Sequence, residues 1–222
     1  PPSPPPSPSP ADGEAGDGDA GALAAHVGAL RQQAGALSDT ARDAAERVAT
    51  RLQGVQQHGE DAGATAAVQR CWDALASSTQ ARLAVGDYGL TVRTTARIRV
   101  PAGGSSANEE RVAVELRSVR GVALRAPDAW SVDPGSTISL GLRAGRERFG
   151  SLIGPAGCID TGCEGCANVA FRLHTTAYGA DVRVVAVRPI AASRLLLARY
   201  DLACEGGRCP ACDTPIAASW VG

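Results

Sequence analysis

Apolar residues near the start of the chain recur at alternating steps of four and three. The positions that follow this rule are Leu23, Val27, Leu30, Ala34, Leu37, Ala41, Ala44 and Val48. A heptad-like seam of this kind, with polar residues between its members, predicts a long amphipathic helix. A second helix is predicted from Thr65 to about Leu83. Together the two predict a helical hairpin over residues 20–84, and the seam leaves self-association through a coiled coil open.

The period changes from helical to two at Gly86. In "DYGLTVRTTARIRV", which starts at Asp87, apolar and polar residues alternate, and this predicts a long strand with one buried face and one solvated face. Further strands are predicted at 119–125, 136–143, 168–175, 181–188 and 194–203. Short strands that follow one another without intervening helices indicate an antiparallel sandwich. We therefore expect an α+β fold in which residues 85–222 form a β-sandwich.

Residues 1–19 have a different composition from the rest of the chain. "PPSPPPSPSP" lacks most backbone donors and is expected to run as an extended polyproline II spacer. The acidic, glycine-rich "ADGEAGDGDA" is typical of a linker. Proline-serine stretches are also substrates for O-linked modification. The candidate glycosylation positions are Pro4, Pro5, Pro6, Ser7, Pro8, Ser9 and Pro10.

Charge and composition exclude several classes of function. The formal net charge is -1, so the chain has no overall field that would favour nucleic acid. Lysine is absent, which excludes a Walker-type phosphate site and Schiff-base chemistry. No apolar run is long enough for a membrane-spanning helix, so membrane attachment is expected only through flanking segments outside this sequence.

Six of the seven cysteines carry the strongest motif in the chain. "CIDTGCEGC" and "CEGGRCPAC" repeat the spacing Cys-x4-Cys-x2-Cys. One interpretation is disulfide cross-links that use all six cysteines of the two motifs. These disulfide candidates are Cys158, Cys163, Cys166, Cys204, Cys209 and Cys212. The alternative is a zinc site in which the two C-x2-C pairs, Cys163 with Cys166 and Cys209 with Cys212, supply four thiolates.

The disulfide interpretation is preferred for two reasons. The 42 residues between the two C-x2-C pairs exceed the spacing of about 15–20 residues in compact zinc modules. A zinc site would also leave Cys158 and Cys204 without a role. A redox-active dithiol is the third reading, and it is disfavoured because neither pair precedes a helical pattern. Cys71, beside Trp72, is the odd cysteine and is expected to be a buried thiol or to pair elsewhere.

No catalytic constellation is visible. His26, His58 and His174 share no metal-binding spacing, and Asp160-Thr161-Gly162 is a single copy of a tripeptide that pepsin-like proteases need twice. We therefore expect neither enzymatic activity nor a cofactor. Arg93, Arg97 and Arg99 form a basic stripe on the solvated face of the predicted strand, which is either a solvated sheet face or a contact for an anionic glycan.

The proline-serine leader and the Ala/Gly/Arg-rich, cysteine-containing β region resemble the hydroxyproline-rich surface glycoproteins of volvocine green algae. The resemblance rests on "PPSPPPSPSP" and on composition, and it implies an extracellular, glycosylated, non-enzymatic protein of the cell surface or matrix. A second likeness, in the order of elements, is to the membrane-proximal modules of adhesion receptors and polycystins. The expected function is structural or adhesive, with other surface proteins or glycans as partners; the alternative is an intracellular zinc-organised protein-interaction domain.

Overall fold

The structure is a computed structural model, and it describes residues 21–53, 62–86, 89–101, 113–125, 142–144, 147–199 and 207–216. The spacer and linker predicted at 1–19, with its glycosylation candidates, lie outside the described residues. So do Cys204 and His58. Among the helices that are described, none has the length and apolar character needed to cross a membrane.

In the part of the chain that the structure describes, three helices precede the strands: α1 (Gly21–Gly35), α2 (Asp39–Gln53) and α3 (Ala62–Ala76). The predicted long first helix is therefore wrong, because the chain turns between α1 and α2. The backbone N–H groups of Leu37 and Ser38 donate to the Ala34 carbonyl, and the Ser38 hydroxyl accepts from Ala41 N at 3.1 Å. Ser38 thus caps the N-terminus of α2, and the expected two-helix hairpin is a three-helix unit.

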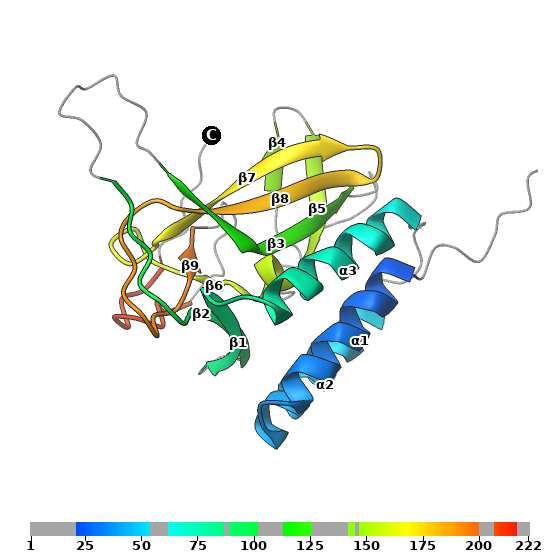
Figure 1. The fold of residues 1–222 in the computed structure, drawn as a ribbon, viewed down its shortest axis with the longest axis horizontal. Coiled ribbons are helices and arrows are strands. Elements are labelled where there is room, and N and C mark those ends of the chain that lie inside the picture. Colours follow the sequence, from blue (N-terminus) through cyan, green and yellow to red (C-terminus); the bar gives the residue numbers. More distant parts are fainter. Residues whose placement is uncertain are drawn as a thin grey trace, which may run out of the picture.

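The helices pack on one another and on the sheet, so the predicted coiled coil is also wrong. α1 contacts both α2 and α3, and α3 lies against strand β3 (Val114–Arg125) (Figure 1). Leu30 and Ala34 of the seam are buried within this unit, whereas Leu37 is 44% exposed in the turn. A small-residue seam permits such close packing inside one chain.

The strands form two sheets. A hairpin of β1 and β2 makes the smaller sheet, and the larger has the order β4-β5-β3-β8-β7-β9-β6. The bounds are β1 (Ala81–Gly86), β2 (Gly89–Thr94), β4 (Leu142–Ala144), β5 (Glu147–Ile153), β6 (Asp160–Thr161), β7 (Val169–Thr176), β8 (Gly179–Ala186) and β9 (Leu197–Ala198). Strand β9 runs parallel to both β6 and β7, while the other pairs are antiparallel.

The antiparallel β-sandwich predicted for residues 85–222 is therefore wrong. The larger sheet is mixed, and α3 rather than a second sheet packs against β3 (Figure 1). The strand predicted to run through "DYGLTVRTTARIRV" ends at Thr94, where the backbone N–H donates to Arg194 O and the hydroxyl donates to Ala191 O at 2.8 Å. Beyond that point, Ile98 forms only an isolated bridge with Ile190. Apolar and polar residues alternate on both sides of this bend, so the sequence pattern does not reveal it.

A histidine joins the helices to the sheet. His26 of α1 is only 4% exposed, and its Nδ1 accepts from Trp72 Nε1 of α3 at 3.2 Å and from the backbone N–H of Gly154 at 2.9 Å. Gly154 has a φ of 90° and lies against Gly121 and Cys71, so a side chain there would be strained. Burial lowers the pKa of His26 to about 4, which keeps the imidazole neutral and able to accept.

Candidate metal centre

The first C-x2-C pair lies on a tight turn between β6 and β7. The Cys163 carbonyl accepts from Cys166 N at 3.0 Å and from Ala167 N at 2.8 Å, which folds the four residues back on themselves. Gly162 precedes the turn, and a Cβ at this position would come within 2.8 Å of Leu197 Cβ. The glycine therefore lets the turn lie directly against β9, and both cysteine side chains end up half-buried.

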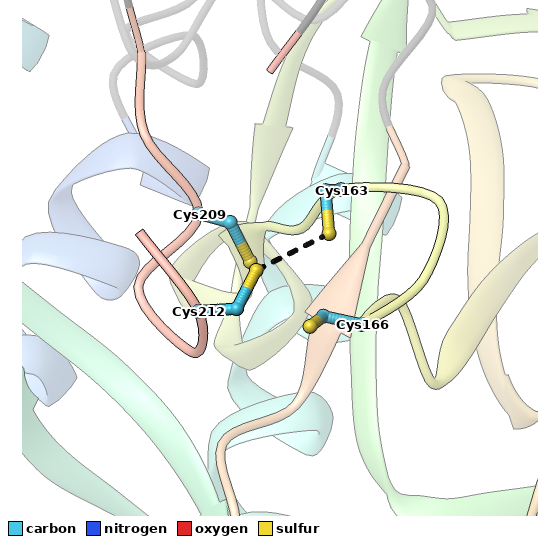
Figure 2. A group of neighbouring side chains, drawn as sticks. All are labelled: Cys163, Cys166, Cys209 and Cys212. Atoms are coloured by element: carbon cyan, nitrogen blue, oxygen red, sulfur yellow. Dashed lines mark hydrogen bonds between the residues drawn. The ribbon is translucent and has the colours of Figure 1, made fainter. Parts of the chain in front are cut away.

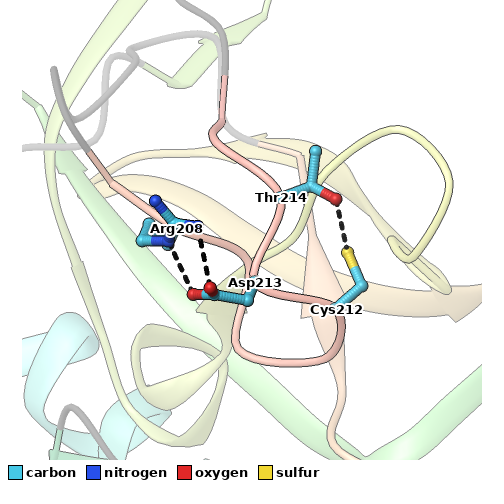
Figure 3. Close-up of polar contacts among 4 residues, drawn as sticks. All are labelled: Arg208, Cys212, Asp213 and Thr214. Carbon is cyan, nitrogen blue, oxygen red and sulfur yellow. Dashed lines mark hydrogen bonds and ion pairs between the residues drawn. The ribbon is translucent and has the colours of Figure 1, made fainter.

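The second pair repeats this geometry near the end of the described chain. The Cys209 carbonyl accepts from Cys212 N at 3.3 Å and from Asp213 N at 2.8 Å, and Cys209 N donates to Thr214 O. The guanidinium of Arg208 donates two hydrogen bonds, of 2.6 and 2.7 Å, to the Asp213 carboxylate (Figure 3). The identical spacing in the sequence thus corresponds to one repeated backbone turn.

The two turns face one another and bring four sulfur atoms together. The Sγ atoms of Cys163, Cys166, Cys209 and Cys212 all lie within 4.8 Å of one another, and those of Cys163 and Cys212 are 3.6 Å apart (Figure 2). A disulfide requires about 2.05 Å, so this pair is not covalently joined. We refer to these four residues as the cysteine cluster.

Hydrogen bonds shift the pKa values of two thiols in the cysteine cluster in opposite directions. The Thr214 hydroxyl lies 3.1 Å from the Cys212 sulfur (Figure 3), and its bond to the thiolate, helped by the Thr214 backbone, lowers the pKa of Cys212 to about 6. Hydrogen bonds to Cys212 and Cys163 raise the pKa of Cys166 to about 12. Thr214 thus favours the thiolate form of Cys212, and the thiolate is the form in which a cysteine binds a metal ion.

An arginine outside the cysteine cluster donates hydrogen bonds to the first turn. Arg188 follows β8, and its guanidinium donates to Ala167 O through Nε at 2.7 Å and to Gly165 O through Nη1 at 2.6 Å. Its Nη2 also donates to Ala167 O. Asn168 secures the same turn to β9, because its side chain accepts from Leu197 N at 3.0 Å. The positions of Cys163 and Cys166 are therefore set by bonds made outside the cluster.

The predicted disulfides are wrong for the described cysteines. Cys71, Cys158, Cys163, Cys166, Cys209 and Cys212 are all free thiols. Cys158 lies in the short 3₁₀ helix η2 (Pro155–Cys158), outside the cysteine cluster, and burial raises its pKa to about 12. Cys71 is buried on α3, where desolvation raises its pKa to about 11. The four residues of the zinc alternative are the ones that the structure brings together.

The long separation of the two pairs has a structural reason. The chain leaves the first turn along β7, returns along β8, and passes β9 before it reaches the second turn. Since β9 pairs with both β6 and β7, the outward and return paths begin and end at one edge of the sheet (Figure 1). The described residues between the two pairs, 167–199 and 207–208, leave this edge and return to it, so the spacing rule for compact zinc modules does not apply.

The remaining candidate residues lie elsewhere. His26 is a buried core residue, and His174 is exposed on β7. Arg93 donates to Ser193 O at 3.4 Å, while Arg97 and Arg99 are exposed beyond the end of β2. Sequence reasoning missed the supporting roles of Arg188 and Thr214. Only Thr214, two residues after the last cysteine, carried a sequence signal.

Comparisons with known proteins add little to this geometry. No family model and no curated protein matches the chain. Among solved structures, the chain is similar to a crystal structure from Plasmodium falciparum named as a candidate histone methyltransferase. The TM-score is 0.38 and the identity 12%, over 55% of this chain and 94% of that one. A likeness this distant carries no argument about function. The resemblance to volvocine glycoproteins stays a prediction.

Proposed function

We propose that the cysteine cluster binds one structural Zn²⁺ and that the chain is a zinc-organised protein-interaction domain. The observation that carries this proposal is the convergence of four thiols, from two identical turns, to within 4.8 Å of one another. The two turns are far apart in the sequence, so it is the fold that brings them together.

The cluster fits the dimensions of a tetrahedral zinc site. Zn–S bonds are about 2.3 Å, which corresponds to sulfur atoms about 3.8 Å apart at the corners of the tetrahedron. The Cys163–Cys212 separation of 3.6 Å is close to this value. Four soft thiolates favour zinc or iron over magnesium or calcium, which prefer oxygen ligands. With four protein ligands the coordination is complete, and no position stays open for a reacting water.

The expected role of the ion follows from what surrounds the second turn. Of the described residues 207–216, only Cys209 is buried, so this segment has almost no apolar core of its own. The bonds from Cys209 N to Thr214 O and from Ile216 N to Gly207 O close it on itself. Coordination would fix it to the 163–166 turn, and binding energy of this kind replaces hydrophobic burial in small metal-organised units.

The proposal changes the expected compartment. Disulfides were the main support for an extracellular adhesive module, and free thiols arranged for a metal ion are more typical of a reducing environment. The extracellular location now rests on the proline-serine spacer alone and stays a prediction. The binding partner of a zinc-organised domain would be a protein, recognised by surfaces that the metal holds in place.

The test is the metal content of the purified protein and of matched cysteine variants. We expect one zinc per chain by elemental analysis for the wild type, and no stoichiometric zinc for Cys163→Ser or Cys209→Ser. Cys158→Ser is the control, because this thiol lies outside the cluster, and it should keep its zinc. Absence of metal, together with a mass increase of two hydrogens for each disulfide that a reductant cleaves, would overturn the proposal.

A further inference from the structure

A pocket lies where the chain leaves β2 and passes the turn after β8. Its volume is about 490 Å³, and it is lined by Arg97, Arg99, Val100, Pro101 and Pro189. This volume is within the range of sites for small molecules, about 300–1,000 Å³. None of its lining residues belongs to the cysteine cluster.

The backbone around the pocket is fixed. Ile98 and Ile190 lie between and beside the lining residues, both are buried, and each donates its backbone N–H to the carbonyl of the other, at 2.8 and 3.0 Å. This bridge holds the 97–101 segment against the 189–190 segment. These two backbone hydrogen bonds therefore keep the two lining segments side by side.

Two guanidinium groups point to an anionic ligand. Arg97 and Arg99 are two positions apart in an extended segment, so their side chains leave the backbone on the same side. Both are exposed, and neither has an ion pair or hydrogen bond to another residue in the part of the chain that the structure describes. Arg93, the third arginine of the predicted stripe, donates to Ser193 O instead. Of the three arginines, Arg93 therefore bonds within the chain, whereas Arg97 and Arg99 are available to bind a ligand.

The other walls select for an apolar part of the ligand. Val100, Pro101 and Pro189 present hydrocarbon surface beside the two guanidinium groups. We propose that this pocket binds a small phosphate monoester whose phosphate lies between Arg97 and Arg99 and whose apolar ring or chain covers the proline and valine surface. A phosphate dianion matches two positive charges and the forked donors of arginine. A sulfated glycan, with its polar surface, would leave the hydrocarbon wall unused.

Phenyl phosphate is a suitable probe, and calorimetric titration of the full chain at pH 7.5 keeps it dianionic. We expect saturable one-to-one binding that weakens about tenfold in Arg97→Gln and again in Arg99→Gln, since each loses a charge-assisted hydrogen bond. Inorganic phosphate should bind at least tenfold more weakly, because it lacks the apolar part. Arg172→Gln is the matched control: it removes an exposed strand arginine outside the pocket and should leave the affinity unchanged.

Several results would contradict the phosphate monoester site. These are equal binding of inorganic phosphate, an equal loss in Arg172→Gln, tighter binding of a heparin-derived hexasaccharide, or no saturable binding at all. Far-ultraviolet circular dichroism verifies the fold of each variant. If the glutamine variants do not fold, the double change Arg97→Lys and Arg99→Lys replaces them. It keeps both positive charges but removes the paired N–H donors of each guanidinium, and it should still weaken binding several-fold. Zinc content measured on the same samples shows whether a loss of phosphate binding occurs without a loss of zinc, so the two proposals can fail independently.

Discussion

The helix–sheet joint and the cysteine cluster stabilise the molecule in different ways. Around His26, Trp72 and Gly154 the side chains are buried, and polar groups are paired within an apolar core. Around the cysteine cluster most side chains are half-buried or exposed, and four sulfur atoms lie within 4.8 Å of one another. The first region is stabilised by area removed from water, whereas the second would be stabilised by the zinc–sulfur bonds that we propose. They should therefore respond to different perturbations.

Removal of the Trp72 ring should produce the largest effect in the first region. Trp72 is 1% exposed and donates to His26, so Trp72→Ala leaves both a large cavity and a less satisfied histidine. We expect a loss of about 3–5 kcal/mol in the free energy of unfolding, measured by urea denaturation. Trp72→Phe, which keeps a ring but not the N–H donor, is the control and should cost clearly less. Equal costs would show that burial of the ring is not what stabilises the joint.

Acid should destabilise the same region. The pKa of His26 is about 4 in the folded protein and close to 6.5 when unfolded. Between these values the unfolded state binds more protons, so stability is complete above about pH 6.5 and falls as the pH drops toward 4. The total contribution is about 3 kcal/mol.

Denaturation at a series of pH values checks this expectation. His26→Gln should flatten the pH dependence between 6.5 and 4, while His174→Gln, which alters an exposed histidine, should leave it as in the wild type. An unchanged slope in His26→Gln would assign the acid sensitivity to other groups.

Substitution of Arg188, which donates to the first cysteine turn, should lower metal affinity more than it lowers folding stability. Arg188→Gln removes the guanidinium that donates to Ala167 O and Gly165 O. Loss of such outer bonds typically lowers metal affinity about 10–100-fold, and competition with a chelator of known affinity measures it. Arg172→Gln is the charge-matched control. If Arg188→Gln keeps wild-type zinc affinity, the turn holds its cysteines without this arginine.

The smallest effect is expected at Thr214. Its hydroxyl and backbone bond to Cys212 and lower the pKa of that thiol. Thr214→Val removes the hydroxyl, so the pKa of Cys212 should rise and protons should compete better with the metal. The pH at which half of the zinc is released should therefore move upward, with several-fold weaker binding at neutral pH. Thr175→Val, which alters an exposed threonine of β7, should cause no shift, and a downward shift in Thr214→Val would contradict this expectation.

The sequence predicted the elements better than their boundaries and arrangement. Helical seams and alternating strands were visible because burial imposes their periods. The break at Ser38 was missed because a heptad seam continues across it, although a capping serine stood at the break. The bend after Thr94 was missed for a related reason, since it depends on bonds to residues 191 and 194, far away in the chain. The mixed sheet could not be derived from strand patterns, which do not state which strands pair.

For the cysteines, the sequence showed two pairs of matched spacing and gave one zinc site of these four thiolates as the alternative, but disulfides were preferred. The repeated C-x2-C spacing fixes a local backbone shape that recurs at Cys163 and at Cys209. Whether the two turns join one another depends on β7, β8 and β9 returning the chain to one sheet edge. Spacing rules drawn from compact modules argued against zinc for this reason. Cys158 was predicted to form a disulfide with another motif cysteine, whereas it is a free thiol in η2, outside the cysteine cluster.

The most direct test of the metal centre is X-ray absorption at the zinc edge of the purified protein. We expect one zinc per chain surrounded by four sulfur atoms at about 2.3 Å, with the signal of zinc–sulfur bonding lost in Cys163→Ser. A first shell of oxygen or nitrogen, or protein that carries no zinc after purification without chelators, would contradict it.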